Sequence, residues 1–134
     1  MNTVFVDTSG FYALLDSTDP AHKKITAAFM QAEKENWRLI TTNYVVHESW
    51  AIIQHRLGWK ALEAFLDVIL PACEIQYVTE PLFTLGAVRC RQARQRKLSL
   101  SDCISLEFIR QKRIIFVIAE DEHFRREGLK YPVE

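Results

Sequence analysis

The fold of this chain is decided by the stretch TVFV at residues 3–6, which is followed directly by Asp7. A run of β-branched and aromatic residues without polar alternation is typical of a strand buried on both faces of a parallel sheet. The run IIFVIA at 114–119 is the strongest strand in the chain, and RLITT at 38–42 and EIQYV at 74–78 are further expected strands. The sequence therefore predicts a sheet whose strands are spread along the whole chain.

Segments with helical periodicity separate these strands. The expected helices cover residues 11–15, 19–35, 44–57, 59–70, 82–97 and 100–111. Asp19 followed by Pro20 favours the start of the second helix, and Asn43 is available to cap the third. Strands that alternate with helices require right-handed crossover connections and produce a parallel sheet. We expect an α/β fold in one domain over residues 1–134, since this length suits a single core.

Composition excludes several classes of protein. The chain has 17 Lys and Arg against 17 Asp and Glu, which excludes a uniformly basic coat for nucleic acid. It has 4 glycines and none of the glycine-rich phosphate-binding or nucleophile-elbow motifs. The 3 cysteines form no CxxC pair and lie far from the histidines, so zinc is unsupported and reduced thiols in a cytoplasmic protein are expected. We expect no membrane span and no secretory signal.

Two acids stand at expected strand ends. Asp7 follows the first strand, and Asp121 lies just past the last. Because loops and helix starts converge at the carboxyl ends of parallel strands, ligands bind at that edge. Each acid alone also has an ordinary interpretation as a loop or N-cap residue, but the pair favours a site.

Two further acids lie on expected helices. Glu48 has Val45, Ala51 and Ile52 one helical turn away, which places its carboxylate beside an apolar surface where it needs a cation, a metal or a raised pKa. A salt bridge to an arginine is the alternative. Asp102 follows Ser99 by three residues, the spacing of a capping box, but Leu106 and Ile109 on the same helix face indicate that this face points toward the sheet. Both interpretations stay open.

Four converging carboxylates repel one another unless a cation lies between them. Oxygen-only ligation suits Mg²⁺ or Mn²⁺, and Mg²⁺ is commonly held by a few carboxylates together with a substrate phosphate. Such an ion lowers the pKa of a bound water and offsets the charge of the leaving oxygen. The residues Asp7, Glu48, Asp102 and Asp121 are therefore candidate metal ligands and catalytic residues for phosphodiester hydrolysis.

The motifs resemble those of the PIN-domain nucleases, particularly the small VapC-type toxins. The resemblance rests on VDTS at 6–9, Glu48 after TTNYVVH, LSLSD ending at Asp102, and AEDEHF at 119–124. It implies a three-layer α/β/α sandwich with a central parallel sheet, a ribonuclease activity that leaves 5′-phosphate and 3′-hydroxyl ends, and a metal site made by these four acids. The family often has Thr or Ser where this chain has Ala119. We assign the fourth ligand to Asp121, with Glu120 as an alternative.

Positive charge is concentrated in the second part of the chain. Residues up to Leu85 include 6 basic and 10 acidic side chains, whereas those after it include 11 basic and 7 acidic ones. We expect a cluster on the helix 82–97 to hold the RNA backbone, with Arg94 and Lys97 on one helix face; the cluster consists of Arg89, Arg91, Arg94, Arg96 and Lys97. A solvated, salt-bridged helix surface is the alternative interpretation.

Apolar stripes on two neighbouring helices lead to a prediction about partners. The helix 44–57 carries Val46, Trp50, Ile53 and Leu57, and the next carries Trp59, Leu62, Phe65, Leu66 and Ile69. Both stripes have an ordinary interpretation as core. The resemblance to VapC-type toxins implies instead a homodimer and a small antitoxin protein that lays a segment into an apolar groove.

Two other functions are compatible with the pattern. A catalytically silent binding module on the same fold is suggested by Ala119. A phosphoacceptor receiver domain has a similar length and strand pattern. Such domains share a pair of acids after the first strand, where this chain has Val6-Asp7, and a lysine after the last strand, where this chain has Ala119-Glu120.

Overall fold

A computed structural model describes residues 2–133. Its four strands form one parallel sheet in the order β3-β2-β1-β4. The strands are β1 (Thr3–Val6), β2 (Arg38–Thr42), β3 (Cys73–Gln76) and β4 (Phe116–Ile118). The predicted α/β class and the parallel sheet are confirmed.

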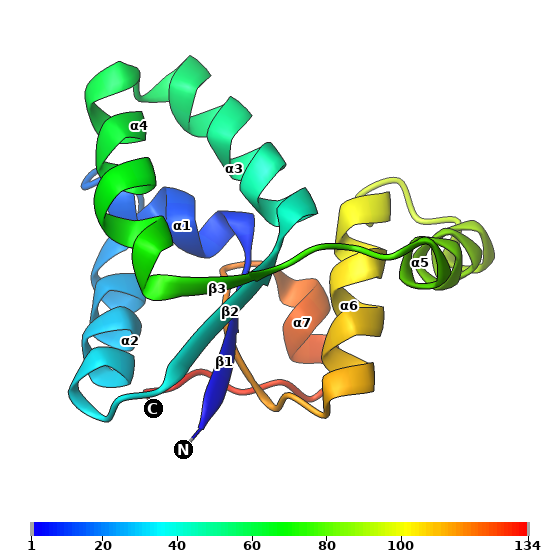
Figure 1. Cartoon of the computed structure of the whole chain (residues 1–134). Coiled ribbons are helices and arrows are strands. Elements are labelled where there is room, and N and C mark those ends of the chain that lie inside the picture. Colours follow the sequence, from blue (N-terminus) through cyan, green and yellow to red (C-terminus); the bar gives the residue numbers. More distant parts are fainter. Residues whose placement is uncertain (1, 134) are drawn as a thin grey trace.

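Helices cover both faces of this sheet, as Figure 1 shows. Helices α1, α2 and α4 lie on one side and α6 and α7 on the other, while α5 packs on α6 and extends away from the sheet. The predicted three-layer α/β/α sandwich is therefore confirmed. The helices are α1 (Thr8–Leu15), α2 (His22–Lys34), α3 (Asn43–Arg56), α4 (Trp59–Ala64), α5 (Glu80–Ala93), α6 (Leu100–Lys112) and α7 (Glu122–Arg126).

Phenylalanines join the layers across the central strand. Phe5 of β1 is fully buried, and its ring lies 5.9 Å from that of Phe108 on α6 and 6.3 Å from that of Phe124 on α7. In the opposite layer, Phe11 of α1 packs edge-on against Phe65 at 5.2 Å. Tilted and edge-on ring pairs add to the free energy gained from burial, so Phe5 anchors β1 to the layer of α6 and α7, and the Phe11–Phe65 pair stabilises the other layer.

Several predicted boundaries are wrong. The helix expected over 82–97 ends at Ala93, because Arg94 adopts a left-handed backbone with φ of 50°. The helix expected over 59–70 is α4 followed by a π-helical turn, Phe65–Ile69, and a 3-10 turn, Leu70–Ala72. Of the stripe predicted on α3, Ile53 is fully buried as expected, whereas Trp50 is 40% exposed. The other buried side chains of this helix are Val45 and Ser49, each one position before the predicted Val46 and Trp50.

Two predicted caps also differ. Asp19 closes a turn by accepting a bond from the amide of Ala21, and α2 begins only at His22. Thr42 caps α3, whereas the side-chain oxygen Oδ1 of Asn43 accepts a bond from the amide of Val78 at 2.7 Å. Asn43 therefore attaches the chain after β3 to the start of α3. Within residues 2–133, no helix combines the length and apolar character needed to span a membrane.

Gly86 sets the closeness of α5 and α6. A Cβ atom at Gly86 would lie 2.4 Å from Cγ1 of Ile104 and 3.0 Å from its backbone, which cannot move aside as a side chain can. We expect Gly86→Ala to lower the free energy of unfolding by about 1–3 kcal/mol through overpacking, despite the better helix propensity of alanine.

Denaturant unfolding measures this effect. Thr84→Ala is the matched control, because it adds an alanine to an exposed position of the same helix. Equal stability of the Gly86→Ala and Thr84→Ala variants would contradict the close contact.

Candidate metal centre

Asp7 lies at the carboxyl end of β1 and caps α1. Its Oδ2 accepts bonds from the amide of Ser9 at 3.3 Å and from the hydroxyl of Ser9 at 3.1 Å, and its own amide donates to the carbonyl of Ile118. The residue is only 5% exposed. Burial, followed by the nearby carboxylates of Asp102 and Glu48, raises the pKa of Asp7 from 3.8 to about 7.

Asp102 fulfils both of the roles that the sequence left open. It forms the capping box of α6, in which the Asp102 amide donates to the Ser99 hydroxyl at 3.0 Å and Asp102 Oδ2 accepts from the Ser99 amide at 3.1 Å. The side chain is also half-buried, and burial together with Asp121 and Glu48 raises the pKa of its carboxyl group. The capping bond engages one carboxylate oxygen and leaves the other available to a ligand.

Glu48 is exposed, so the expected apolar surroundings are wrong for this residue. Among residues 2–133, Glu48 forms no ion pair. The Thr8 hydroxyl instead donates to Glu48 Oε1 at 2.6 Å, and the Ser49 hydroxyl donates to Thr8 Oγ1 at 3.2 Å. Thr8 is buried and holds Glu48 toward Asp7, a role that the sequence analysis missed although it noted the VDTS motif.

Asp121 caps α7 by accepting a bond from the amide of His123 at 2.9 Å. The imidazole of His123 folds back, with Nε2 3.5 Å from Asp121 Oδ1. Ligand atoms of Asp102, Asp121 and His123 lie within 4.8 Å of one another. His123 is therefore a further candidate ligand that the sequence analysis did not consider, since it looked only for zinc patterns.

Glu120 is directed away from these acids. Burial and nearby Asp19 raise the pKa of its carboxyl group and Lys24 lowers it, which places Glu120 against the α2 side of the molecule. The Glu120 amide donates to the hydroxyl of Ser9, which in turn bonds Asp7. This geometry favours Asp121 over Glu120 as the acid of the site, and Ser9 provides a hydroxyl beside Ala119.

The four predicted acids thus lie around one edge of the sheet. Burial raises the pKa values of Asp7 and Asp102 most, other carboxylates raise them further, and hydrogen bonds from Ser9 and Ser99 lower them. Oxygen donors with uncompensated charge fit a hard divalent cation. The donor set therefore suits Mg²⁺ or Mn²⁺.

The predicted basic cluster is divided by the structure. Arg89 is half-buried, and its guanidinium pairs with Glu107 at 2.7 Å and with Glu127. Because α5 ends at Ala93, Arg94 and Lys97 do not share a helix face. Arg91, Arg94, Arg96 and Lys97 are exposed, the last two in the loop that precedes α6.

Comparison with known proteins places this geometry in a family. The sequence model of the PIN-domain family matches residues 4–128. The chain belongs to the PIN-domain family. This membership contradicts the receiver-domain alternative. In two strains of Mycobacterium tuberculosis, the 23S rRNA-specific endonuclease VapC20 is 29% identical over 126 residues, which are 93% of this chain and 94% of the relative.

Solved structures agree with the fold. The sarcin-ricin loop cleaving toxin VapC20 of M. tuberculosis has a TM-score of 0.83 at 24% identity, covering 94% of this chain and 95% of that one. FitAcB from Neisseria gonorrhoeae has a TM-score of 0.69 at 16% identity, covering 96% and 97%. VapBC2 from Rickettsia felis has a TM-score of 0.66 at 11% identity, covering 96% of both chains.

The buried charge of Asp7 predicts a pH-dependent stability. Because the pKa of Asp7 is raised from 3.8 to about 7, its ionisation does not affect the free energy of unfolding below pH 4 and lowers it increasingly between pH 4 and 7. Above pH 7 the free energy of unfolding is lower by on the order of 4 kcal/mol. In EDTA, Asp7→Asn should therefore melt higher than the wild type at pH 8, and the difference should disappear toward pH 4. Asparagine is a suitable replacement because it preserves an N-cap.

Thermal melts in EDTA and in MnCl₂ measure both this effect and the metal. Mn²⁺ should raise the melting temperature of the wild type more than that of Asp7→Asn, because a ligand stabilises the state that binds it. Equal shifts in the two proteins would contradict the site.

Proposed function

We propose that this protein is a Mg²⁺- or Mn²⁺-dependent endoribonuclease and the toxin of a toxin–antitoxin pair in the cytoplasm. The observation that carries the proposal is the Asp7 carboxyl at the carboxyl edge of a parallel sheet in a PIN-domain chain, where burial and then the acids around it raise its pKa to about 7. Burying a carboxyl group beside other acids lowers the stability of the fold, and such an arrangement is typical of a functional site.

The proposed ligands of the cation are Asp7, Asp102, Asp121 and Glu48. When bound, a divalent cation activates water and offsets charge on the leaving oxygen. Asp7 and Asp102 are oriented by their capping bonds, and the Thr8 hydroxyl positions Glu48 through a bond to its Oε1. Glu48 is the exposed member of the set and is suited to accept a proton from the attacking water. The products carry 5′-phosphate and 3′-hydroxyl ends.

We further propose a structured ribosomal RNA as the substrate. The support is the relative whose name specifies 23S rRNA and whose structure is described as that of a toxin cleaving the sarcin-ricin loop. The match covers nearly all of both chains, so the comparison concerns the whole nuclease domain.

Cleavage of a sarcin-ricin loop hairpin tests the activity. We expect MnCl₂-dependent cleavage that EDTA abolishes, and a loss of about 100-fold or more in kcat/KM for Asp7→Asn and Asp102→Asn. Thr8→Val should lose about 10–100-fold, because it removes only the group that positions Glu48. The matched control is Asp67→Asn, an exposed acid outside this edge of the sheet.

Three results would contradict different parts of the proposal. Full activity of Asp7→Asn would reject the ligand assignment. Absence of cleavage by a folded wild type that binds the hairpin would favour the catalytically silent binding module. Harmless expression of an active wild type in the host cell would argue against the toxin role alone.

An apolar groove supports the proposed antitoxin. It has a volume of about 510 Å³ and lies between α2 and the turns after α4, where Met30 is 64% and Val68 70% exposed. The predicted stripe contributes only in part, because Leu62 and Phe65 are fully buried in the core and Ile69 alone lines this groove. An amphipathic helix is the partner that such a groove accepts.

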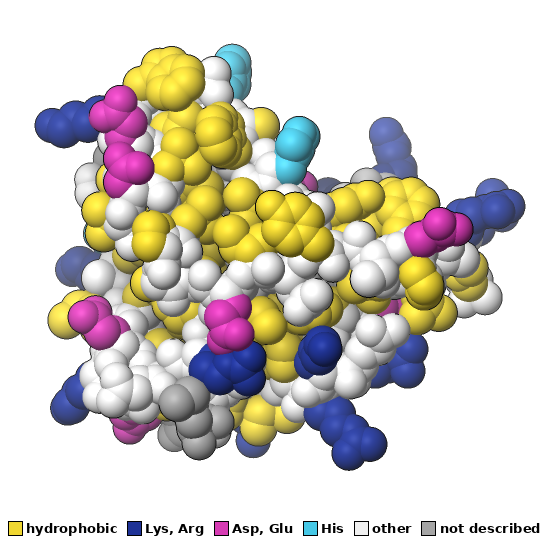
Figure 2. Space-filling view, in the orientation of Figure 1, with side chains coloured by type: hydrophobic (Ala, Val, Ile, Leu, Met, Phe, Trp, Pro, Cys, Tyr) yellow, Lys and Arg dark blue, Asp and Glu magenta, His cyan; other side chains and the backbone are white. Residues whose placement is uncertain are grey.

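Exposed apolar side chains support the proposed homodimer. Figure 2 shows them extending over the face that carries α4, β3 and α5. Trp59 is 59%, Tyr77 69% and Val88 47% exposed. Exposed apolar surface of this extent marks interaction sites in many soluble proteins.

Light scattering measures the oligomeric state. We expect twice the chain mass of 15.6 kDa at tens of micromolar, and a monomer for the double variant Tyr77→Asp, Val88→Glu. Met30→Glu, on another face, is the control and should stay dimeric. A monomeric wild type would reject the dimer and leave the nuclease proposal intact.

A further inference from the structure

A cleft adjoins the acids on the side of Asp121. It has a volume of about 710 Å³ and lies between the loop after α5 and helix α7. The loop contributes Gln95, Arg96 and Lys97, and the other wall contributes Asp121, Glu122, His123 and Arg126. This cleft brings Arg126 next to the loop, although the two are far apart in sequence.

The loop is held in a defined position. The Leu98 side chain is buried, and its carbonyl accepts a weak bond from the thiol of Cys90 on α5. His123 Nε2 lies 3.2 Å from the carbonyl oxygen of Lys97 and 3.5 Å from Asp121 Oδ1. One imidazole ring therefore separates the backbone of Lys97 from an acid of the site, and the side chains of Arg96 and Lys97 extend from an anchored backbone.

The charge of the cleft depends on the site beside it. Arg126 pairs with Glu122 at 3.1 Å, whereas within residues 2–133 Arg96 and Lys97 form no ion pair. Once a cation compensates Asp121, the cleft has an excess of positive charge. A phosphate group is the ligand that suits guanidinium and ammonium groups in this arrangement.

A second concavity continues from the first. It is lined by Arg91 and Arg94, and it shares Gln95 and Arg96 with the cleft. The exposed cations therefore form a path that leads from Asp121 over the loop to the end of α5. Arg89 is excluded from this path because its half-buried guanidinium lies between Glu107 and Glu127, whereas Arg126 is exposed beside the exposed Glu122.

We propose that the cleft binds the RNA phosphate next to the cleaved one, through Lys97 and Arg126, and that Arg91 and Arg94 bind phosphates farther along the same strand. Arg96 lies between the two groups. This inference rests on the proposed nuclease function and adds to it a direction for the RNA strand, which leaves the acids along the loop and not across α3.

Uncharged phosphate replacements test the order of these contacts. Methylphosphonate linkages are introduced one at a time into the hairpin that the wild type cleaves, and its affinity for Asp7→Asn protein is measured. The linkage that neutralises the phosphate next to the cleaved bond should weaken binding about tenfold. In protein that also carries Lys97→Ala or Arg126→Ala, the same linkage should not change the affinity, because the contact between the side chain and that phosphate is already lost.

The pair Arg91→Ala, Arg94→Asn should show this coupling only with linkages farther from the cleaved bond. Asparagine is used because residue 94 has a positive φ. Affinity falls as salt rises, and each lost contact should make the negative slope of log affinity against log salt less steep by about 0.7.

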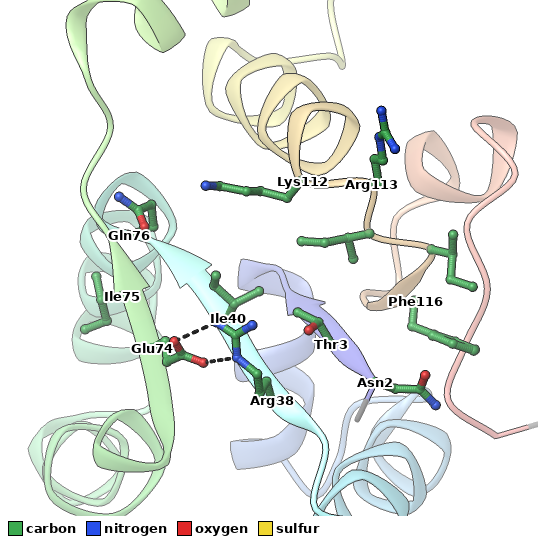
Figure 3. A pocket seen from close by; sticks show the side chains of 12 residues that line it. Asn2, Thr3, Arg38, Ile40, Glu74, Ile75, Gln76, Lys112, Arg113 and Phe116 are labelled. Carbon is green, nitrogen blue, oxygen red and sulfur yellow. Dashed lines mark hydrogen bonds and ion pairs between the residues drawn. The ribbon is translucent and has the colours of Figure 1, made fainter.

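A cationic pocket at the opposite edge of the sheet provides the matched control. Figure 3 shows this pocket, with Lys112 and Arg113 on one side and Thr3 and Arg38 on the other. The variant Lys112→Ala, Arg113→Asn removes the same charge, and Arg113 also has a positive φ. We expect no coupling with any linkage, because contacts and not net charge determine it.

The outcomes separate the two proposals. Cleavage without coupling of Lys97 or Arg126 to an adjacent phosphate overturns the subsite and leaves the nuclease intact. If no RNA is cleaved, the nuclease proposal fails, and binding of a 12-nucleotide single-stranded RNA decides the subsite. Equal affinity of the wild type and Lys97→Ala for that RNA, measured by fluorescence anisotropy, then overturns it.

Discussion

The carboxylate of Asp7 is the constraint on which the rest of the site depends. It is buried at the end of the central strand, and Asp102 and Glu48 raise its pKa further. A buried acid surrounded by other acids destabilises the folded chain unless it is neutralised by a proton or a cation. The apolar contacts that Phe5 of β1 makes with Phe108 and Phe124 contribute to the stability that tolerates this cost.

Three of the four acids also act as helix caps. Asp7 caps α1, Asp102 completes the capping box of α6, and Asp121 caps α7. Each cap uses one carboxylate oxygen on backbone amides and brings the positive end of a helix dipole toward the acid. The caps therefore moderate the repulsion between the carboxylates and orient them at the same time. Glu48 has no such support, and the hydroxyl of Thr8 takes that role.

The sequence predicts this site best where local rules are sufficient. The strand ends identify Asp7 and Asp121, and the spacing of Ser99 and Asp102 identifies a cap that turned out to coexist with an inward-facing acid. Glu48 was placed wrongly because helical periodicity does not show where a helix leaves the sheet. The bond between Thr8 and Glu48 joins residues 40 positions apart, and no local pattern reveals it.

The end of α5 shows why the basic cluster was harder to predict. No glycine or proline follows Ala93, so propensity favours a helix through Lys97, yet Arg94 adopts a positive φ that costs about 1–2 kcal/mol for a residue with a side chain. Burial of Leu98 and the start of α6 at Leu100 require the chain to turn there. This tertiary requirement outweighs the local preference. It also moves Arg96 and Lys97 from an exposed helix face to the wall beside Asp121, so the termination of one helix determines which cations lie near the acids.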